Sequence, residues 1–217
     1  IAVSDTTIEA DALAARIDSF DEINGDNKTT GMTLVSEATI NVASTEITAL
    51  LDDEADGRVT IVDQDINVDS GDISVDTAND LDLTTSGTIT ADITTTETVT
   101  DLKTLTGTHA YTIVIADGDA TSSSASDLNT INGKTSEAVS LENVTALTSS
   151  SLSDLETLAS DIGDGEFSNA TFLTTIAVSD TTIEADALAA RIDSFDEING
   201  DNKTTGMTLV SEATINV

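Results

Sequence analysis

The first 42 residues of the chain occur a second time at its end without a single difference. Residues 1–42 read IAVSDTTIEADALAARIDSFDEINGDNKTTGMTLVSEATINV, and residues 176–217 read the same, so the offset is 175 residues. A repeated fold needs only its hydrophobic pattern, so this identity exceeds what structural convergence produces. We interpret residues 1–175 as one full repeat and residues 176–217 as the start of the next repeat in a long array. An artificial duplication is the alternative.

Composition excludes several classes of protein. The chain has 41 acidic and 7 basic residues, a formal net charge of -34, and neither cysteine nor proline. Without cysteine it forms no disulfides and no thiolate metal site. Nucleic acid is excluded as a partner because phosphate repels this charge. Hydrophobic residues still make up 38% of the chain and aromatic residues 2%, which indicates an ordered protein with a thin core.

Short amphipathic helices are predicted where Ser, Thr or Asp opens a segment, apolar residues follow at helical spacing, and Gly closes it. The opening side chain caps free N–H groups, and the closing Gly favours a left-handed end. This pattern occurs at 44–57, 96–107, 124–133, 151–163 and 180–200. Alternating, β-branched segments predict strands between these helices. They lie at 32–42, 58–68, 109–117, 137–147 and 170–178.

The 50 residues between Gly57 and Gly107 show a different spacing of apolar residues. Apolar doublets recur there every 7 or 8 residues, and no helix is expected before Thr96; the doublets are Ile66/Val68, Ile73/Val75, Leu81/Leu83 and Ile89/Ala91. In a three-sided β-helix each doublet would form one side of about 8 residues, so that a full coil has about 24 residues. Coils of this length are typical of stacked repeats. The sequence therefore predicts a β-solenoid, that is, a parallel β-helix, with short α-helices inserted on one side and about six coils per 175-residue repeat.

Two stretches carry a family resemblance. Residues 124–160, SASDLNTINGKTSEAVSLENVTALTSSSLSDLETLAS, resemble the giant tandem-repeat cell-surface proteins of marine picocyanobacteria, which include a protein needed for swimming without flagella. Residues 65–94 are similar to the β-helical rungs of haemagglutinin-type adhesins. The resemblance extends over most of the repeat, but it consists of a shared low-complexity sequence pattern and includes no invariant catalytic motif. It implies secretion, attachment to the cell surface and great length.

Acidic clusters recur in the expected turns. Calcium prefers several oxygen ligands, and closely spaced carboxylates on a loop supply them. The best candidate metal ligands are Asp63, Asp65, Asp117 and Asp119. The alternative is a solvated acidic surface that keeps the protein soluble. No cofactor is required under either interpretation, and Ca²⁺ is the one ion that the clusters suggest.

Catalysis is not expected. Carboxylates are so numerous that their proximity in sequence indicates no acid–base pair. His109 is the single histidine and lacks the partners of a metal site or a catalytic triad, so it is interpreted as a turn residue. Tyr111 and Phe172 are interpreted as strand core. The sequence therefore predicts that the chain is not an enzyme and has no small-molecule substrate.

Repeat, charge and resemblance together predict a structural segment of a long extracellular filament, surface fibre or coat. The expected partners are the chain itself, through adjacent repeats or neighbouring fibres, and the cell envelope. The expected location is extracellular, at the cell surface. The alternative is the stalk of a giant bacterial adhesin whose ligand-binding tip lies outside these 217 residues.

Overall fold

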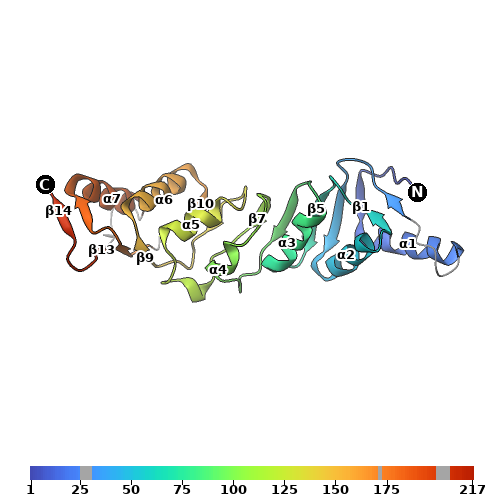
Figure 1. Cartoon of the computed structure of the whole chain (residues 1–217), viewed down its shortest axis with the longest axis horizontal. Helices are drawn as coiled ribbons and strands as arrows, with labels where there is room; N and C mark the ends of the chain where they lie inside the picture. The colour runs from blue at the N-terminus through green and yellow to red at the C-terminus, as the bar shows by residue number, and fades with distance from the viewer. Residues whose placement is uncertain (25–30, 171–172, 199–205) are drawn as a thin grey trace. The chain divides into compact units, whose positions relative to one another are not determined.

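The computed structural model describes residues 1–24, 31–170, 173–198 and 206–217. The chain divides into two compact units. The first comprises Ile1–Thr94 with Leu105–Tyr111, and the second comprises Thr95–Thr104 with Thr112–Val217. Figure 1 shows the helices and short strands of both units, coloured along the chain.

The first unit contains a five-stranded sheet in the order β1-β3-β5-β6-β7. Its strands are β1 (Thr7–Glu9), β3 (Thr39–Ala43), β5 (Asp65–Ser70), β6 (Ile89–Asp92) and β7 (Ala110–Thr112). A second parallel pair joins β2 (Met32–Thr33) to β4 (Val59–Thr60). The helices are α1 (Ala10–Asn24), the 3-10 helix η1 (Ser44–Glu46), α2 (Ile47–Ala55) and α3 (Val75–Thr84). The β1–β3, β3–β5 and β5–β6 pairs are parallel, so each return to the sheet crosses over through a helical segment.

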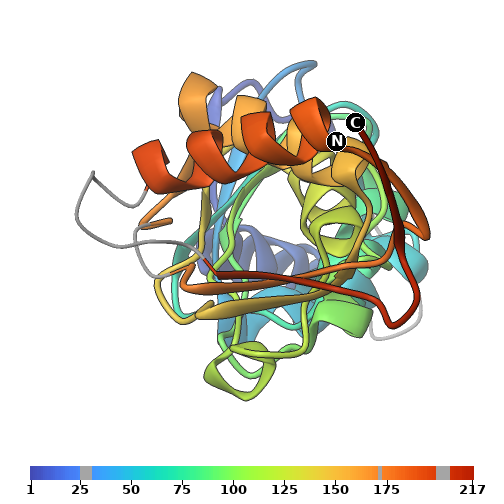
Figure 2. The same ribbon diagram turned by 90° about the vertical axis from the view of Figure 1, so that its left-hand side faces the viewer.

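The second unit repeats this plan with smaller sheets. A three-stranded parallel sheet has β11 (Thr175–Val178) at its centre, between β13 (Gly206–Leu209) and β9 (Ala146–Ser150). Two further parallel pairs join β10 (Phe167–Ser168) to β8 (Val139–Ser140) and β12 (Thr182–Glu184) to β14 (Thr214–Asn216). The helices are α4 (Val99–Leu102), η2 (Asp117–Asp119), α5 (Ala125–Asn132), α6 (Leu152–Asp164) and α7 (Ala185–Ile198). Figure 2 shows α7 in red, and β13 and β14 in dark red, along different sides of this unit.

Hydroxyl side chains cap four successive helices, three of which the sequence pattern predicts. Each accepts a hydrogen bond of 3.0–3.2 Å from the backbone N–H three residues later, which satisfies a donor that the first helical turn leaves free; the caps are Ser74, Thr98, Ser124 and Ser151. The helices predicted within 44–57, 96–107, 124–133, 151–163 and 180–200 are confirmed as α2, α4, α5, α6 and α7.

The prediction of a β-solenoid, or parallel β-helix, is wrong. The described residues form a mixed α/β fold with seven α-helices and several small parallel sheets. Strand pairing is confined to short segments that are divided among five sheets. The physical reason is that capped helices, rather than a further strand, carry the chain between most neighbouring strands.

The error lies between Gly57 and Gly107, where no helix was expected before Thr96. Helix α3 lies there, with Ser74 as its N-cap. Its buried residues Val75, Ala78 and Leu81 are three apart, which is the spacing of one helix face, whereas Leu83 is 84% exposed. The doublet Leu81/Leu83 therefore mimics strand alternation, but only its first member enters the core.

Candidate functional site: two faces of the repeated segment

The two copies of the repeated segment fold in the same way. In the first copy, β1 pairs with β3 so that Ile8 lies opposite Ile40, and in the second copy β12 pairs with β14 so that Ile183 lies opposite Ile215. Helix α1 in the first copy corresponds to α7 in the second. The described residues of the two copies thus adopt the same strand–helix–strand arrangement, although different segments of the chain lie next to each copy.

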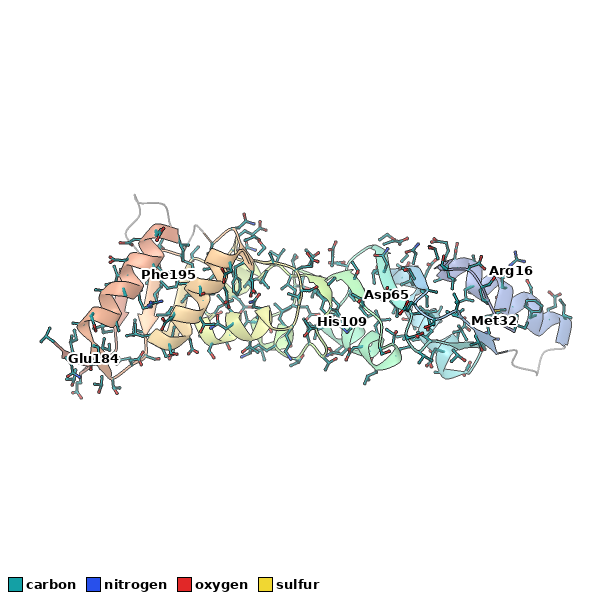
Figure 3. All side chains as sticks on the ribbon, turned by 90° about the horizontal axis from the view of Figure 1, so that it is seen from above. Arg16, Met32, Asp65, His109, Glu184 and Phe195 are labelled. Carbon is teal, nitrogen blue, oxygen red and sulfur yellow. The ribbon has the colours of Figure 1, made fainter. Side chains whose placement is uncertain are left out.

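A polar contact outside the core is reproduced as well. In the first copy the amide of Asn41 donates to the carboxylate of Glu9 at 2.8 Å, and in the second copy Asn216 donates to Glu184 at 2.7 Å. Figure 3 labels Glu184 on the second copy. Since these side chains are exposed and still pair identically, the local fold of the segment is set by its own sequence.

The copies differ in the face that meets the residues after the segment. We call this the following face; it comprises Met32, Leu34, Ile40 and Val42 in the first copy and Met207, Leu209, Ile215 and Val217 in the second. In the first copy β5 pairs with β3 and β4 with β2, so Ile40 and Val42 are 0% and 1% exposed. In the second copy Ile215 is 47% and Val217 114% exposed. The residues that follow the first copy, in β4 and β5, therefore bury this apolar face.

The opposite face shows the reverse difference. We call it the preceding face; it comprises Ile1, Val3, Arg16 and Phe20 in the first copy and Ile176, Val178, Arg191 and Phe195 in the second. In the second copy β9 pairs with β11, and Ile176, Val178 and Phe195 are 0%, 1% and 0% exposed. Ile1 is 52% exposed. The following face is therefore buried in the first copy, and the preceding face is buried in the second copy.

The preceding face of the first copy is hollowed. Val3, Ile8, Leu13 and Arg16 line an open groove there. Arg16 is exposed (Figure 3), whereas its equivalent Arg191 in the second copy packs beside α6. In the second copy the neighbouring helix α6 thus reaches the guanidinium side of this face, through Glu156.

Guanidinium groups lie where neighbouring helices meet. Arg58 contacts Asp53 of α2 at 3.0 Å and Asp18 of α1 at 3.9 Å, and Arg191 of α7 contacts Glu156 of α6 at 3.7 Å. Partly exposed ion pairs contribute little energy, about 0–1 kcal/mol each. In a chain of net charge -34, they nevertheless reduce repulsion at the contacts that hold the helices together.

Lys103 joins α4 to α5 in the same manner, through the carboxylate of Asp127. Burial acts to raise the pKa of Asp127, but hydrogen bonds from Lys103 and Ser124 outweigh it and hold the pKa below its usual value. The ionised carboxylate is thus the form that the folded unit favours. Arg58, Lys103 and Arg191 thus each connect neighbouring elements in the described part of the chain.

Two of the predicted calcium ligands, Asp63 and Asp65, accept hydrogen bonds from other residues of the first unit. Asp63 accepts hydrogen bonds from the hydroxyl of Ser36 and the amide of Gln64. Asp65 (Figure 3) begins β5 and accepts the backbone N–H of Thr88 at 2.7 Å. These contacts tie neighbouring segments of the first unit together.

The second predicted pair lies in η2. Asp119 accepts the backbone N–H of Val99 at 2.9 Å and the hydroxyl of Ser122 at 3.0 Å, and Asp117 is exposed. Across the described ranges, no group of three or more His, Cys, Asp or Glu side chains is arranged to hold a metal ion. Calcium binding by these four aspartates stays a prediction.

His109 is a buried residue directly before β7, and its interpretation as a turn residue is wrong. It is 8% exposed, its Nδ1 accepts the backbone N–H of Ile89 at 3.2 Å, and its Nε2 lies 2.7 Å from Asp82. Tyr111 is fully buried beside it, which confirms the prediction of strand core. Phe172 lies outside the described residues. Sequence reasoning missed the Asp82–His109 pair because 27 residues separate its members.

The Asp82–His109 pair predicts a specific dependence on pH. The hydrogen bond from His109 lowers the pKa of Asp82 below its ordinary value of 3.8, although burial opposes this shift. A lowered carboxyl pKa stabilises the fold above the unfolded pKa, and this contribution is lost as the pH falls through the folded pKa. D82N should therefore lower the free energy of unfolding near pH 6, and the difference from wild type should shrink below about pH 3.8.

Urea denaturation at both pH values measures this effect. Asp80 lies on the same helix and is exposed, so D80N serves as the matched control and should have little effect at either pH. A D82N deficit that persists unchanged in acid would contradict the assigned role of the ionised carboxylate.

No protein-family model, curated protein or solved structure matches the chain. The assignment to adhesins or filament proteins therefore has no support from any relative, and the resemblance to picocyanobacterial surface proteins stays a prediction. Of the helices in the described ranges, none combines the length and the apolar character that crossing a membrane requires.

Proposed function

We propose that the chain is a structural segment of a long extracellular tandem-repeat polypeptide, in which each 175-residue repeat is held between identical neighbours. The observation that carries this proposal is the complementary burial of the two copies. Ile40 is buried by residues C-terminal to the first copy, and Ile176 is buried by residues N-terminal to the second copy. A segment inside an array has both neighbours, so both of its apolar faces are covered.

Contact energetics favour this arrangement. Burying an apolar side chain contributes about 1.5–3 kcal/mol, and the following face of the second copy leaves Ile215 and Val217 largely exposed. Supplying the next repeat would bury these residues as their equivalents Ile40 and Val42 are buried. In repeat proteins, such interfaces between neighbours provide most of the stability.

The charge distribution fits a structural role. The described ion pairs of Arg58, Lys103 and Arg191 lie between neighbouring elements, while the excess of carboxylates faces solvent. Like charges on a surface keep a long polymer soluble and limit lateral association. We propose the extracellular space as its location, and neighbouring repeats and the cell envelope as its partners.

The length of the native polypeptide tests this function. Denaturing electrophoresis in a large-pore gel, with an antibody against the repeated segment, should reveal a product far larger than the 22.3 kDa of these 217 residues. Limited proteolysis should yield fragments that differ by whole 175-residue repeats. A single native product near 22.3 kDa would contradict a covalent array.

A further inference from the structure

We propose that His109 is a pH-sensitive latch in the first unit: its neutral imidazole joins β6 to α3, and a proton taken up at Nδ1 releases β6 while the ring stays bound to Asp82. His109, Asp82 and the β6 residue Ile89 all belong to the first unit. The inference goes beyond the proposed function, because it concerns a local response to acid rather than the assembly of repeats.

The two hydrogen bonds of the ring fix where its proton lies. The backbone N–H of Ile89 donates to Nδ1 at 3.2 Å, so Nδ1 carries a lone pair. The proton of the neutral ring is therefore on Nε2, which donates to Oδ1 of Asp82 at 2.7 Å. In a neutral histidine one ring nitrogen donates and the other accepts, and the partners of the two decide which is which. The surroundings of His109 thus select one tautomer.

An imidazole nitrogen here accepts a backbone N–H of the sheet, a role that a carbonyl usually has. β7 is the neighbour of β6 in the five-stranded sheet. On the other side of β6 the bonding is ordinary, since the N–H of Ile66 donates to the carbonyl of Thr88 at 2.9 Å. A carbonyl keeps its lone pairs near neutral pH, whereas an imidazole nitrogen that binds a proton can no longer accept. The bond from Ile89 is therefore one that protonation of a side chain can break.

Protonation redistributes the contacts of the ring. A proton from solvent binds the lone pair of Nδ1, the ring gains one positive charge, and the N–H groups of His109 and Ile89 then face each other as two donors. The bond from Nε2 to Asp82 becomes charge-assisted and is strengthened. The imidazolium therefore stays with α3 and gives up β6, so the change is confined to this part of the sheet.

Close packing at Gly107 keeps the ring beside Asp82. A Cβ at Gly107 would lie 2.5 Å from Oδ1 of Asp82 and 2.6 Å from Nε2 of His109. The main chain therefore packs directly on the pair, which cannot separate unless this turn moves.

Two other titratable groups are among the described contacts of the ring, Asp82 on α3 and Tyr111 on β7. The hydrogen bond from His109 holds the pKa of Asp82 below its ordinary value, so this carboxylate stays ionised near neutral pH. Burial and the charge of Asp82 raise the pKa of Tyr111, so its phenol stays neutral. Ile89 of β6 and Gly107 of the turn bring no charge to the ring. Between about pH 8 and pH 5 the group that changes charge at this junction is therefore His109.

Imidazole ¹⁵N NMR of the full-length chain provides the first test. His109 is the single histidine, so the ring signals belong to it. At pH 8 the proton is expected on Nε2, and on titration to pH 5 the amide proton of Ile89 should shift with the same midpoint as Nδ1. The proposal would be overturned by a proton on Nδ1 at pH 8, by a ring that stays neutral down to pH 5, or by an Ile89 signal that does not follow the titration.

Hydrogen exchange separates a local latch from general loosening. Protection of the Ile89 amide, corrected for intrinsic exchange, should fall roughly tenfold from pH 8 to pH 5, as expected for one lost hydrogen bond. The Ile66 amide donates to a backbone carbonyl and should keep its protection within about twofold. H109N retains an acceptor oxygen on a side chain that does not titrate, so the fall at Ile89 should disappear. An equal fall at Ile66, or an undiminished fall in H109N, would show that acid acts by another route and that the proposal is wrong.

Discussion

Replacing Ile40 with alanine is expected to lower the free energy of unfolding of the first unit by about 2–5 kcal/mol, the usual cost of truncating a large core side chain. Ile40 is fully buried, and it lies between Ile8 of β1 and Ile66 of β5. The cavity left by I40A would therefore have strand neighbours on both sides, and little room to collapse.

The same substitution in the second copy is the matched control. Ile215 occupies an identical sequence context and pairs with Ile183, but it is 47% exposed. I215A should cost less than about 1 kcal/mol, because surface positions rarely cost more. Urea denaturation and hydrogen exchange at the β3 and β14 amides measure the two effects. Equal costs for I40A and I215A would contradict the assignment of one covered and one open following face.

Much of the local structure could be predicted from the sequence. Capping hydroxyls such as Ser124 and Ser151, with apolar residues after them at helical spacing, locate α5 and α6 correctly. The pattern fails at α3, where Leu83 alternates with Leu81 although it faces solvent. Short apolar runs fit a strand and a helix equally well, and only the packing of neighbours separates them.

The site was predictable only in part. The identity of the two copies indicates that the chain contacts other repeats. Two identical sequences cannot show, however, which face of each copy is buried by neighbouring residues. Coverage depends on the residues that flank each copy, as the contrast between Ile40 and Ile215 shows. The Asp82–His109 pair likewise depends on the crossover of the chain through α3, which periodicity alone does not reveal.

G87A is expected to destabilise the first unit by about 2–3 kcal/mol, the cost of forcing an extra group into packed backbone. A Cβ at Gly87 would lie 2.3 Å from the carbonyl oxygen and 2.5 Å from the carbonyl carbon of Gln64, and 2.9 Å from the nitrogen of Asp65. These atoms belong to the main chain, so no side-chain rotation relieves the clash.

The turn at Gly87 is fixed by its own hydrogen bonds. The hydroxyl of Thr85 donates to the Gln64 carbonyl at 2.6 Å and accepts the Gly87 N–H at 2.9 Å. Movement of Gly87 would break this link and disturb the adjacent β5–β6 pairing, where Ile66 lies opposite Ile89. Urea denaturation and hydrogen exchange at both isoleucine amides therefore report the loss.

Gly118 provides the matched control, because a Cβ there meets nothing within 4 Å and its φ is not positive. G118A should leave the free energy of unfolding within about 0.5 kcal/mol of wild type, or raise it slightly by restricting the unfolded chain. A cost for G87A no greater than that for G118A would show that the contact between residues 62–65 and residues 85–88 is looser than the structure places it.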